Sequence, residues 1–580
     1  MTIAKPLPAT QWKIKNNLNK DITDSFSNEF KIHQIISQIL VNRDYLDLED
    51  VRHYLQPSLN DLYSPFLMKD MKAGISRLLK AIYDHENIVI YGDYDADGIT
   101  SVVILYKFLK EITPDVTYYI PDRILEGYGL KNQAIDKFKS NDVRLIITVD
   151  CGISDHTQIS YARTLGIDTI VLDHHAISGA LPPSAANINP KREDCPFPFK
   201  DLAGVGIAYN FLIALRGSLR KDGFWKNDEY PNLKEYLDVV ALGTIGDIAP
   251  LIDENRIFAK IGLELITEGK RPGIKALKEI SGIDGQIIDS FKASFCLIPR
   301  INASGRIASP LDAVALLLTE DMEEARMLAA KLDTYNRRRQ SMEKIILHEI
   351  LAKISNNPDF EKMNALVFAS DRWHPGVVGI VASRLVDLFS RPAFVISLKD
   401  GIGKGSGRSI SDFNIYKGIQ QCASLLLSYG GHNHAAGISI KEGDVAEFTI
   451  LLDDIIRDSG QFTDLVSQTF IDSECQLKDI NMSLINQLQI LAPFGSKNPE
   501  PVLCTRNVKV SSTSIVGNNH LKMSVSSNGM SCNSIWFTMG RYLKSVAGAN
   551  LDIVFTPQIN QWNGSSDIQL KMKDVTILSE

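Results

Sequence analysis

The chain has 580 residues, with 44% hydrophobic and 23% charged side chains and a formal net charge of −7 at pH 7. That length exceeds what one hydrophobic core supports, so several globular domains are expected. The negative balance excludes a protein that coats nucleic acid through charge alone, although arginines can still gather locally. The chain lacks a long apolar run and the apolar segment of a signal peptide, and its seven cysteines are scattered without a C-x-x-C pair. These features disfavour a membrane span, a disulfide framework and a structural zinc site, and they predict a cytoplasmic protein.

Residues 1–80 are expected to form an amino-terminal region of helices and loops. From residue 81 the pattern changes to short β-branched runs that alternate with amphipathic stretches. The runs lie at residues 88–91, 116–120, 145–149 and 168–172. Alternating strands and helices predict βαβ units and a mainly parallel sheet, in a domain over residues 81–250.

Three further regions follow. Residues 251–360 are predicted to be a helical connecting region that ends in a long charged helix without glycine or proline. An α/β pattern returns over residues 361–460. Short strands and Asn/Gly/Ser turns over residues 461–580 indicate a small β-barrel. The predicted fold class is therefore α/β, with two α/β domains joined by a long helix and followed by the barrel.

The sequence DYDADG places Asp93, Asp95 and Asp97 at alternate positions directly after an apolar run. One explanation is an EF-hand calcium loop, whose signature begins with this spacing and ends with Glu at position twelve. Counted from Asp93, position twelve is Ile104, and the segment before Asp93 is predicted to be a strand rather than a helix. The pattern therefore disfavours an EF-hand and favours a site at the end of a strand.

More acids and imidazoles follow the later apolar runs of the same region. They are Asp150, the triplet Asp173, His174 and His175, and finally Asp247. An aspartate after a strand is most often a helix N-cap, and a lone histidine is usually a core or surface group. Four such sites at one edge of a predicted parallel sheet are harder to explain in that way. So many anions need a cation, and carboxylates mixed with imidazole suit Mn²⁺ or Mg²⁺ better than Zn²⁺.

Two such ions, about 3.5–4 Å apart, would be enough to bridge a scissile phosphate and an attacking water. One ion lowers the pKa of the water, and both stabilise the charge that builds up on the phosphate oxygens. That chemistry is phosphoester hydrolysis. The chain has no G-x-x-x-x-G-K-[ST] loop, so a nucleotide-driven motor is not supported.

The blocks DYDADG, VDCG, LDHH and GTIGDIA occur here in the order found in the DHH phosphoesterase superfamily, which the chain resembles. Further blocks narrow the resemblance to the single-strand-specific exonucleases of that superfamily. They are PFLMKDM, IPRINASGRI, WHPGVVGIVASRL, GGHNHAAG and LAPFGSKNPEPVL. The resemblance covers nearly the whole chain and implies a DHH domain, a DHH-associated domain and an OB-like barrel.

The resemblance also implies which residues form the metal site. The implied ligands of two ions are Asp93, Asp95, Asp150, His174 and Asp247. Asp150 would bridge the ions, with Asp93 on one of them and the remaining three ligands on the other. The other candidate catalytic residues, Asp97, Asp173 and His175, would orient the ligands or approach the phosphate.

The chain departs from the family pattern at two positions. Lys497 stands where relatives usually carry glycine, which puts the local turn in question. Tyr91 stands where some relatives carry a histidine, and water would replace any ligand lost there.

Arginines beside small residues are candidates for binding the phosphates of a polymer, because a guanidinium meets phosphate oxygens in a bidentate way. Arg300 and Arg306 flank a small-residue segment with Asn302 between them. We expect all three to contact phosphate. The arginine run at 337–339 is instead interpreted as solvated surface charge, the commoner fate of an arginine.

A second group of candidates lies on glycine-rich segments. The resemblance implies that Ser406 and Arg408, together with Arg123, recognise a 5′ end. It also implies that His432 contacts a phosphate near the metals, with the alternative that it ties down a glycine turn. The barrel aromatics Trp536, Phe537 and Trp562 are weaker candidates for base stacking, because such residues are more often core.

The function implied by the resemblance is a metal-dependent 5′→3′ exonuclease that hydrolyses single-stranded DNA to mononucleotides in repair and recombination. The alternative enzyme is a DHH phosphodiesterase for short oligonucleotides or cyclic dinucleotides, although such relatives usually end after the DHH-associated domain. An inactive DHH scaffold that only binds strands or partners is disfavoured, because the full set of carboxylates is present. The resemblance further implies a monomer that works with a single-strand-binding protein and a helicase.

Overall fold

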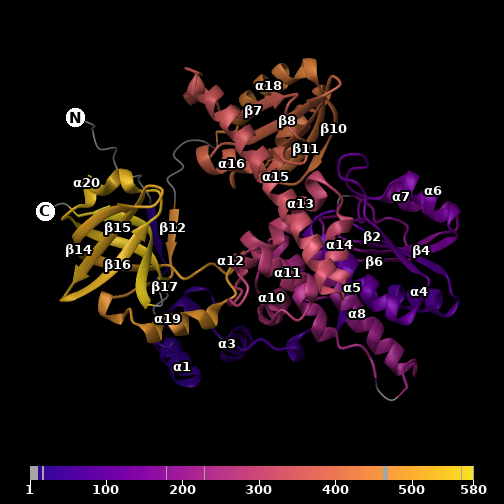
Figure 1. The fold of residues 1–580 in the computed structure, drawn as a ribbon, viewed down its shortest axis with the longest axis horizontal. Coiled ribbons are helices and arrows are strands. Elements are labelled where there is room, and N and C mark those ends of the chain that lie inside the picture. The colour runs from indigo at the N-terminus through magenta and orange to yellow at the C-terminus, as the bar shows by residue number, and fades with distance from the viewer. Residues whose placement is uncertain are drawn as a thin grey trace. The chain divides into compact units, whose positions relative to one another are not determined.

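The computed structural model describes residues 11–15, 19–177, 179–226, 229–460, 468–562 and 565–578. The fold is drawn in Figure 1, and the chain divides into two compact units. Unit 1 contains Met1–Leu62, Pro250–Lys260 and Leu465–Glu580, and unit 2 contains Tyr63–Ala249 and Ile261–Asp464. Within the ranges that the structure describes, none of the helices combines the length and apolarity needed to cross a membrane.

Unit 2 contains a five-stranded sheet with the order β3-β2-β4-β5-β6, in which every pairing is parallel. Its strands are β2 (Asn87–Gly92), β3 (Val116–Tyr119), β4 (Val143–Val149), β5 (Asp168–Leu172) and β6 (Ala186–Ile188). The side chains of β2 and β4 are buried almost throughout, as expected when helices cover both faces of a parallel sheet. The predicted parallel sheet is confirmed.

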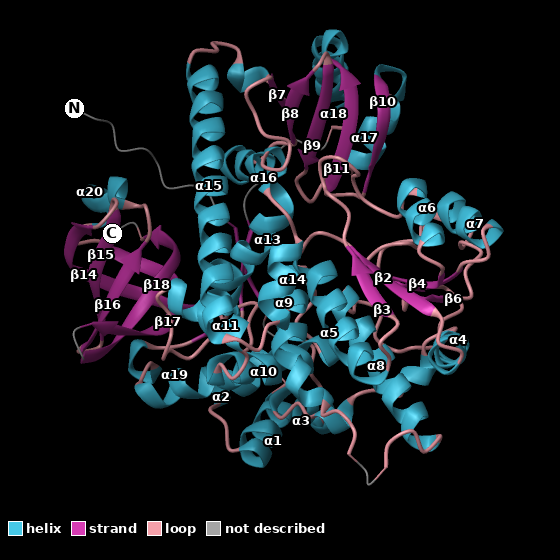
Figure 2. Ribbon diagram, turned by 45° about the vertical axis from the view of Figure 1, so that its right-hand side comes forward, coloured by secondary structure: helices cyan, strands magenta, loops and turns pink. Residues whose placement is uncertain are grey.

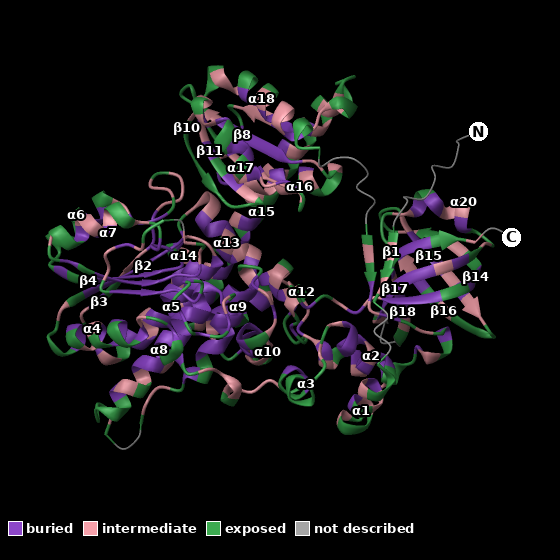
Figure 3. Ribbon diagram, turned by 180° about the vertical axis from the view of Figure 1, so that it is seen from behind, coloured by how far each residue is buried: buried purple, intermediate pink, exposed green. Residues whose placement is uncertain are grey.

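Helices pack on both faces of this sheet. α4 (Met71–Tyr83), α5 (Ala96–Ile112) and α8 (Gly204–Lys221) contact one face. α6 (Asn132–Ser140) and α7 (His156–Thr164) lie on the other, where they share a core with β2 and β4. Figure 3 shows α5 and α9 (Leu237–Gly246) buried almost throughout, because both helices carry apolar residues on every side.

The strand order creates a place for a ligand. After β2 the chain adds β3 on one side of that strand and then β4 on the other. The segments that leave the carboxyl ends of β2 and β4 therefore diverge, which is the topological switch point where α/β sheets bind ligands.

A helical segment follows the first sheet. Its helices are α10 (Asp253–Glu268), α11 (Pro272–Ile280), α12 (Ser290–Lys292), α13 (Ile298–Ile307), α14 (Leu311–Leu318) and α15 (Met322–Ser355). A π-helical segment, Ala293–Leu297, joins α12 to α13 without a break. α15 has 34 residues, appears as one long helix in Figure 2, and confirms the predicted connecting helix.

The second sheet of unit 2 has the order β10-β11-β9-β8-β7, with a parallel β7–β8 pair and antiparallel pairs elsewhere. Its strands are β7 (Leu366–Ser370), β8 (Ala393–Lys399), β9 (Ile402–Arg408), β10 (Leu426–Gly431) and β11 (Ala435–Lys441). Its helices are α16 (Val378–Phe389), α17 (Ile415–Gln421) and α18 (Val445–Asp458). This part is the second predicted α/β domain.

Unit 1 contains a closed barrel. Its strands are β13 (Ser473–Glu474), β14 (Leu503–Val516), β15 (His520–Ser527), β16 (Met530–Trp536), β17 (Asn550–Trp562) and β18 (Ser565–Ile577). Pairing of β14 with β17 closes the sheet and confirms the predicted barrel. The accompanying helices are α1 (Lys20–Phe30), α2 (Gln34–Asn42), α3 (Leu48–Leu55), α19 (Met482–Leu488) and α20 (Leu543–Val546).

Distant segments of the chain come together in unit 1. β1 (Gln11–Ile14) pairs in parallel with β12 (Gln468–Ile471), so part of the amino-terminal region expected to contain helices and loops is a strand. Arg256 is almost fully buried and donates hydrogen bonds to the carbonyl oxygens of Tyr54 (2.9 Å) and Leu491 (3.1 Å). One side chain therefore joins all three segments of the unit.

The first turn of α5 depends on a glycine. A Cβ atom on Gly98 would lie 2.5–2.7 Å from the backbone of Asp93, which is too close without a shift of one segment. We expect Gly98→Ala to lower the free energy of unfolding by about 1–3 kcal/mol, the usual range for overpacking. Urea denaturation would measure the change.

Gly217 of α8 is the matched control, because it is also helical and a Cβ added there would have nothing within 4 Å. Gly217→Ala should leave stability unchanged or raise it by up to about 1 kcal/mol through helix propensity. Equal stability of the two variants would contradict the close approach of α5 to Asp93.

Candidate active site

The ends of three neighbouring strands bring the acidic residues together. Asp93 follows β2, Asp150 follows β4, and Asp173 follows β5. Asp150 has φ 58°, a left-handed conformation that aspartate tolerates better than most residues, and its backbone NH still bonds to Leu172 O (3.0 Å). The strand pairing therefore continues up to Asp150, which fixes the position of this carboxylate.

Asp95 and Asp97 lie at the start of α5, and both carboxylates accept hydrogen bonds from backbone NH groups. Asp95 is the N-cap, and its Oδ1 accepts the backbone NH groups of Asp97 (3.0 Å) and Gly98 (3.2 Å). The two carboxylate oxygens of Asp97 accept the NH groups of Gly204 (2.7 Å) and Val205 (2.8 Å). These NH groups open α8, whose amino-terminal dipole favours a negative charge.

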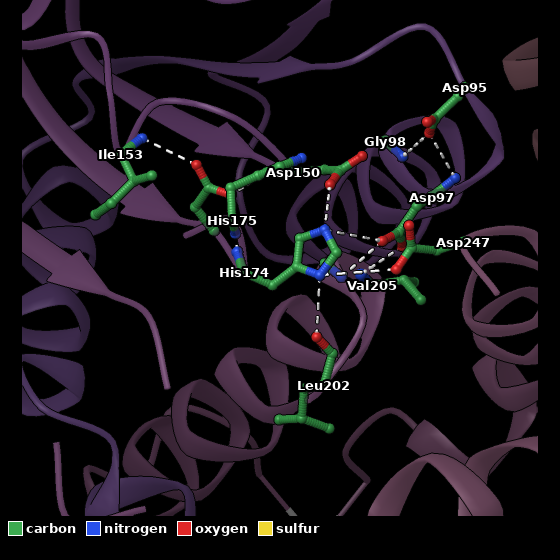
Figure 4. Close-up of polar contacts among 12 residues, drawn as sticks. Asp95, Asp97, Gly98, Asp150, Ile153, His174, His175, Leu202, Val205 and Asp247 are labelled. Carbon is green, nitrogen blue, oxygen red and sulfur yellow. Dashed lines mark hydrogen bonds and ion pairs between the residues drawn. The ribbon is translucent and has the colours of Figure 1, made fainter. Parts of the chain in front are cut away.

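His174 lies between the carboxylates, as Figure 4 shows. Its Nε2 is 3.1 Å from Asp150 Oδ1 and 4.0 Å from Asp97 Oδ2. Its Nδ1 is 3.2 Å from Leu202 O, an oxygen that can only accept, so Nδ1 carries the proton in that bond. In a neutral ring the lone pair of Nε2 then faces a carboxylate oxygen, an arrangement that a cation between them would make favourable.

Asp247 completes this set from the carboxyl end of α9. Its Oδ2 lies 3.7 Å from His174 Nδ1, and its side chain is 31% exposed. Partial desolvation and the nearby charge of Asp95 raise the pKa of Asp247 to about 7. Asp247 is thus the most accessible member of the buried carboxylate cluster.

The buried carboxylates repel one another. Burial and the charge of Asp95 raise the pKa of Asp93 well above its usual value. Burial and neighbouring carboxylates do the same to the pKa values of Asp97 and Asp150. Burial, together with the charge of His175, lowers the pKa of His174 to about 3. Isolated charges are costly in such a place unless a cation compensates them.

The donor set fits divalent cations. Within the described residues, three groups have ligand atoms that all lie within 4.8 Å of one another. They are Asp93 with Asp95 and Asp150, Asp97 with His174 and Asp247, and Asp150 with His174 and His175. Asp93 Oδ1 is buried and has no hydrogen-bond partner among the described atoms. Oxygen-rich sites with one imidazole suit Mn²⁺ or Mg²⁺.

Asp173 faces the backbone rather than this cluster. Its Oδ2 accepts the NH of Ile153 (2.9 Å), and its Oδ1 accepts the NH of His174 (2.7 Å) and Nδ1–H of His175 (2.7 Å). Burial raises the pKa of Asp173, but the hydrogen bond and charge of His175 outweigh it and lower that pKa to about 2. Burial lowers the pKa of His175, yet the bond to Asp173 raises it to about 9. The pair shapes the loop that presents His174.

A second feature of the site is a cluster of arginines formed by Arg123, Arg306 and Arg408. Burial and the charge of Arg123 lower the pKa of Arg306 to about 10, and the same two causes lower the pKa of Arg408. Arg408 donates to Ser406 Oγ (3.1 Å), and a Cβ on Gly379 of α16 would meet that oxygen at 2.8 Å. Mutually repelling guanidinium groups beside a hydroxyl and the start of a helix form a suitable environment for an anion.

Arg300 and Asn302 have other partners. Arg300 is bonded to the buried Asp333 of α15 (2.7 Å) and to Cys296 O, so its guanidinium is committed to the fold. Asn302 Oδ1 accepts the NH of Ala96 (2.8 Å) and helps to cap α5. These contacts do not support phosphate binding by Arg300. A phosphate would have to compete with the buried Asp333 for the guanidinium, and the stabilising Arg300–Asp333 ion pair would be lost.

The remaining predicted residues, His432 and the barrel aromatics, lie in different surroundings. The ring of His432 stacks on that of His175 with centroids 6.3 Å apart, which places it beside the acidic cluster. Trp536 is buried against Tyr542 and belongs to the barrel core, whereas Phe537 is 43% exposed. The side chain of Trp562 lies outside the described part of the chain.

The arginine run at residues 337–339 is expected to be solvated surface charge, and Arg339 departs from that expectation. Arg337 and Arg338 are exposed as expected. Arg339 is only 13% exposed and bonds to Asn336 and Glu343, so it is part of the helix packing.

Three residues near the site, Tyr94, Tyr128 and Lys191, were not identified from the sequence. The guanidinium of Arg123 lies over the ring of Tyr94, 4.8 Å from its centroid. The hydroxyl of Tyr128 is 3.3 Å from both Asp150 O and His175 Nδ1. Lys191 is near enough for its charge to contribute to lowering the pKa of His174 and of His432. Tyr94 could have been found from its place within DYDADG, but nothing local marks Lys191.

The comparisons with known proteins agree with this architecture. The DHH family N-terminal domain matches residues 87–244, the DHHA1 domain residues 362–458, and the RecJ OB domain residues 471–574. The single-stranded-DNA-specific exonuclease RecJ of Bacillus subtilis is 37% identical over 98% of this chain and 71% of its own length. That of Escherichia coli is 34% identical over 88% and 90% of the two chains.

Solved structures give the same result. The crystal structure of RecJ from Thermus thermophilus with Mn²⁺ has a TM-score of 0.84 and 27% identity, covering 99% of this chain and 80% of that one. A structure of exonuclease RecJ bound to manganese has a TM-score of 0.59 and 33% identity, over 69% and 96%. With its three matched domains, the acid-imidazole site and this similarity along its length, the chain belongs to the RecJ family.

Proposed function

We propose that the chain is a metal-dependent exonuclease that hydrolyses single-stranded DNA from the 5′ end to mononucleotides. The observation that supports this most is the set of buried carboxylates around His174 at the switch point of a parallel sheet, with Asp93 Oδ1 unpaired among the described atoms. Relatives at 34–37% identity are named single-stranded-DNA-specific exonucleases.

Two Mn²⁺ or Mg²⁺ ions would be held by this site. Ligand atoms of Asp93, Asp95 and Asp150 lie within 4.8 Å of one another and would hold one ion. Those of His174 and Asp247 group with Asp97 and would hold the other, with Asp150 3.1 Å from His174. This grouping puts Asp95 with Asp93, whereas the family resemblance implies Asp95 on the ion of His174 and Asp247. When bound, such ions supply Lewis acidity toward the attacking water and positive charge for the phosphate oxygens. Asp97 and Asp173 then act through the groups that they hold in place, the opening of α8 and the loop of His174.

The 5′ terminal phosphate would bind at Arg123, Arg306 and Arg408, with Ser406 as a further donor. Guanidinium groups meet phosphate in a bidentate way, and their mutual repulsion falls when an anion lies between them. His432, stacked on His175, is placed to contact a phosphate beside the acidic cluster.

Several finer statements stay predictions. They include the domain boundaries at residues 80, 250, 360 and 460, a monomeric state, a cytoplasmic location, and work with a single-strand-binding protein and a helicase in repair and recombination. The alternative activity is hydrolysis of short oligonucleotides or cyclic dinucleotides. The match of residues 471–574 to an OB domain favours a polymer instead, because OB folds bind single strands.

Digestion of end-labelled DNA tests the proposal. With Mn²⁺ present, a 5′-labelled single strand should release labelled mononucleotide from the first turnover, whereas a blunt duplex should resist. A 3′-labelled strand should shorten progressively before its label appears in mononucleotide. Faster cleavage of dinucleotides than of long strands would favour the alternative activity.

Asp150→Asn is the matched inactive variant, because asparagine also tolerates the left-handed backbone of this position and removes only the charge. We expect it to lose about 10²- to 10³-fold in rate, as for loss of one group that stabilises developing charge, while keeping most strand binding. Turnover near that of the wild type would contradict the metal site.

Arg408→Ala tests recognition of the 5′ end. Loss of charge-assisted hydrogen bonds worth about 1.5–3 kcal/mol should raise KM for a 5′-phosphorylated strand by about 10- to 150-fold. The same variant should change KM for a 5′-hydroxyl strand much less. An equal change for both substrates would place the terminal phosphate elsewhere.

Arg300→Ala and Arg306→Ala should separate a structural from a binding arginine. Among the described residues, removing Arg300 leaves the buried Asp333 with Arg337 as its one remaining ion-pair partner, so the free energy of unfolding should fall by about 3 kcal/mol in urea denaturation. Arg306 has no hydrogen bond or ion pair from its guanidinium among the described residues, so Arg306→Ala should keep its stability and lose about tenfold in affinity for single-stranded DNA. The reverse pattern would restore Arg300 as a phosphate ligand.

A further inference from the structure

A lysine follows the edge strand β6 at the same end of the sheet as the acidic cluster. The order β3-β2-β4-β5-β6 places β3 and β6 at the two edges, and the aspartates of the cluster follow strands that lie between them. Arg123 of the arginine cluster comes after β3, and Lys191 comes three residues after the last residue of β6. Because all these strands are parallel, their carboxyl ends lie together. A basic residue therefore follows the strand on each side of the row of carboxylates.

The turn that carries Lys191 is tied to the neighbouring loop after β5. The pairing of β5 with β6 continues past both strands, because the NH of Asp173 donates to Ile188 O (3.1 Å). The buried Asn189 donates from Nδ2 to His175 O (2.9 Å), and its Oδ1 accepts the NH of Lys191 (2.8 Å). The backbone of Lys191 is therefore held in a fixed position relative to the loop that presents the two histidines.

The side chain of Lys191 is not used by the fold. The next residue, Arg192, is buried and donates from Nη1 to Asp70 Oδ2 (2.6 Å) and Asn187 O (2.7 Å), so its guanidinium is committed to packing. Lys191 itself is exposed, and among the described residues its ammonium has neither a hydrogen bond nor an ion pair. A lysine ammonium without a protein partner, beside an acidic site, is available to bind an anionic ligand.

The charge of Lys191 acts on the side of the cluster formed by His174, Asp247 and His432. Burial has the largest effect on the pKa of each of these groups, and Lys191 contributes to lowering the pKa at all three. The side chain of Asp247 is 31% exposed and His432 is exposed, so a ligand can reach this side. In the proposed function an ion held here meets the scissile phosphate, whereas the arginine cluster binds the 5′ terminal phosphate. Lys191 is thus placed for the scissile phosphate.

We propose that Lys191 is a catalytic residue whose ammonium contacts a non-bridging oxygen of the scissile phosphate and stabilises the charge that builds up on it. In the reaction the oxygen of water bonds to phosphorus, and the bond from phosphorus to the 3′ oxygen of the first nucleotide breaks. One proton of the water ends on that 3′ oxygen, the shortened strand keeps the phosphate, and Lys191 keeps its protons throughout. A compact positive charge suits this role. The inference rests on the proposed exonuclease function and adds a residue to it.

Rates of digestion of a 5′-phosphorylated single strand with Mn²⁺ test the contribution of the charge. Lys191→Gln should lower kcat/KM by about 10- to 100-fold, as expected for loss of a hydrogen bond to a charged group. Lys191→Arg keeps the charge and should restore most of the rate. Because the side chain is exposed and unpaired among the described residues, neither variant should change the midpoint of urea denaturation.

Lys139→Gln is the matched control. Lys139 is also an exposed lysine of the same domain, but it lies in the last turn of α6, which leads to the amino end of β4 and so to the opposite end of the sheet. Its replacement removes the same charge from the chain and should leave kcat/KM unchanged.

Binding to the hydrolysis-deficient Asp150→Asn protein, with Mn²⁺ present, identifies the phosphate that Lys191 contacts. The probes are 5′-phosphorylated oligonucleotides in which a methylphosphonate makes the first, second or third internucleotide linkage neutral. With unmodified DNA, adding Lys191→Gln should weaken Kd by about tenfold. That loss should disappear when the first linkage is neutral, because the ammonium then has no charge to meet. It should persist when the second or third linkage is neutral.

The outcomes separate failure of this role from failure of the proposed function. If the wild-type enzyme does not degrade single-stranded DNA, the proposed function is wrong and the role of Lys191 is wrong with it. If it does, equal rates for Lys191→Gln and Lys139→Gln would overturn the role of Lys191 alone. A loss of affinity that disappears with a neutral second linkage instead of the first would place the ammonium on the next phosphate and would also overturn the proposed contact.

Discussion

Repulsion among carboxylates held at the carboxyl ends of β2, β4 and β5 is the constraint on which the rest of the site depends. The structure meets it in two ways. Asp97 and Asp173 are satisfied by backbone NH groups, those of Gly204 and Val205 for the first and of Ile153 and His174 for the second. Asp93, Asp150 and Asp247 receive little of this compensation, which is the reason for proposing them as ligands of cations.

The helical run ending in α13 connects the separate parts of the proposed chemistry. A Cβ on Gly305 would lie 2.0 Å from Tyr94 O, and one on Gly376 would lie 2.0 Å from Arg306 O. These glycines let α13 press against DYDADG on one side and the segment before α16 on the other. Arg306 of the arginine cluster is therefore held on a helix that packs directly against the segment carrying Asp93 and Asp95.

Much of this organisation could be predicted from local patterns. The alternation of β-branched runs with helices gave the parallel sheet, and strand ends with acids gave the site, because both follow from chain direction within a sheet. Arg300 could not be assigned in this way, since its partner Asp333 lies 33 residues away and meets it only through helix packing. The pairing of β1 with β12 and the core position of Trp536 likewise depend on contacts that no local pattern contains.

Asp95 caps α5 and is also a proposed metal ligand, and these two roles restrict the choice of residue at this position. Its Oδ1 already accepts two NH groups at the start of α5, so only part of its capacity is left for an ion. Glutamate would keep the charge, but its longer side chain is a poor N-cap, and asparagine would keep the cap but lose the charge. If Asp95 holds a cation as proposed, the shortest acidic side chain is the one that can begin the helix and bind the ion at once, so helix initiation and the proposed chemistry depend on the same residue.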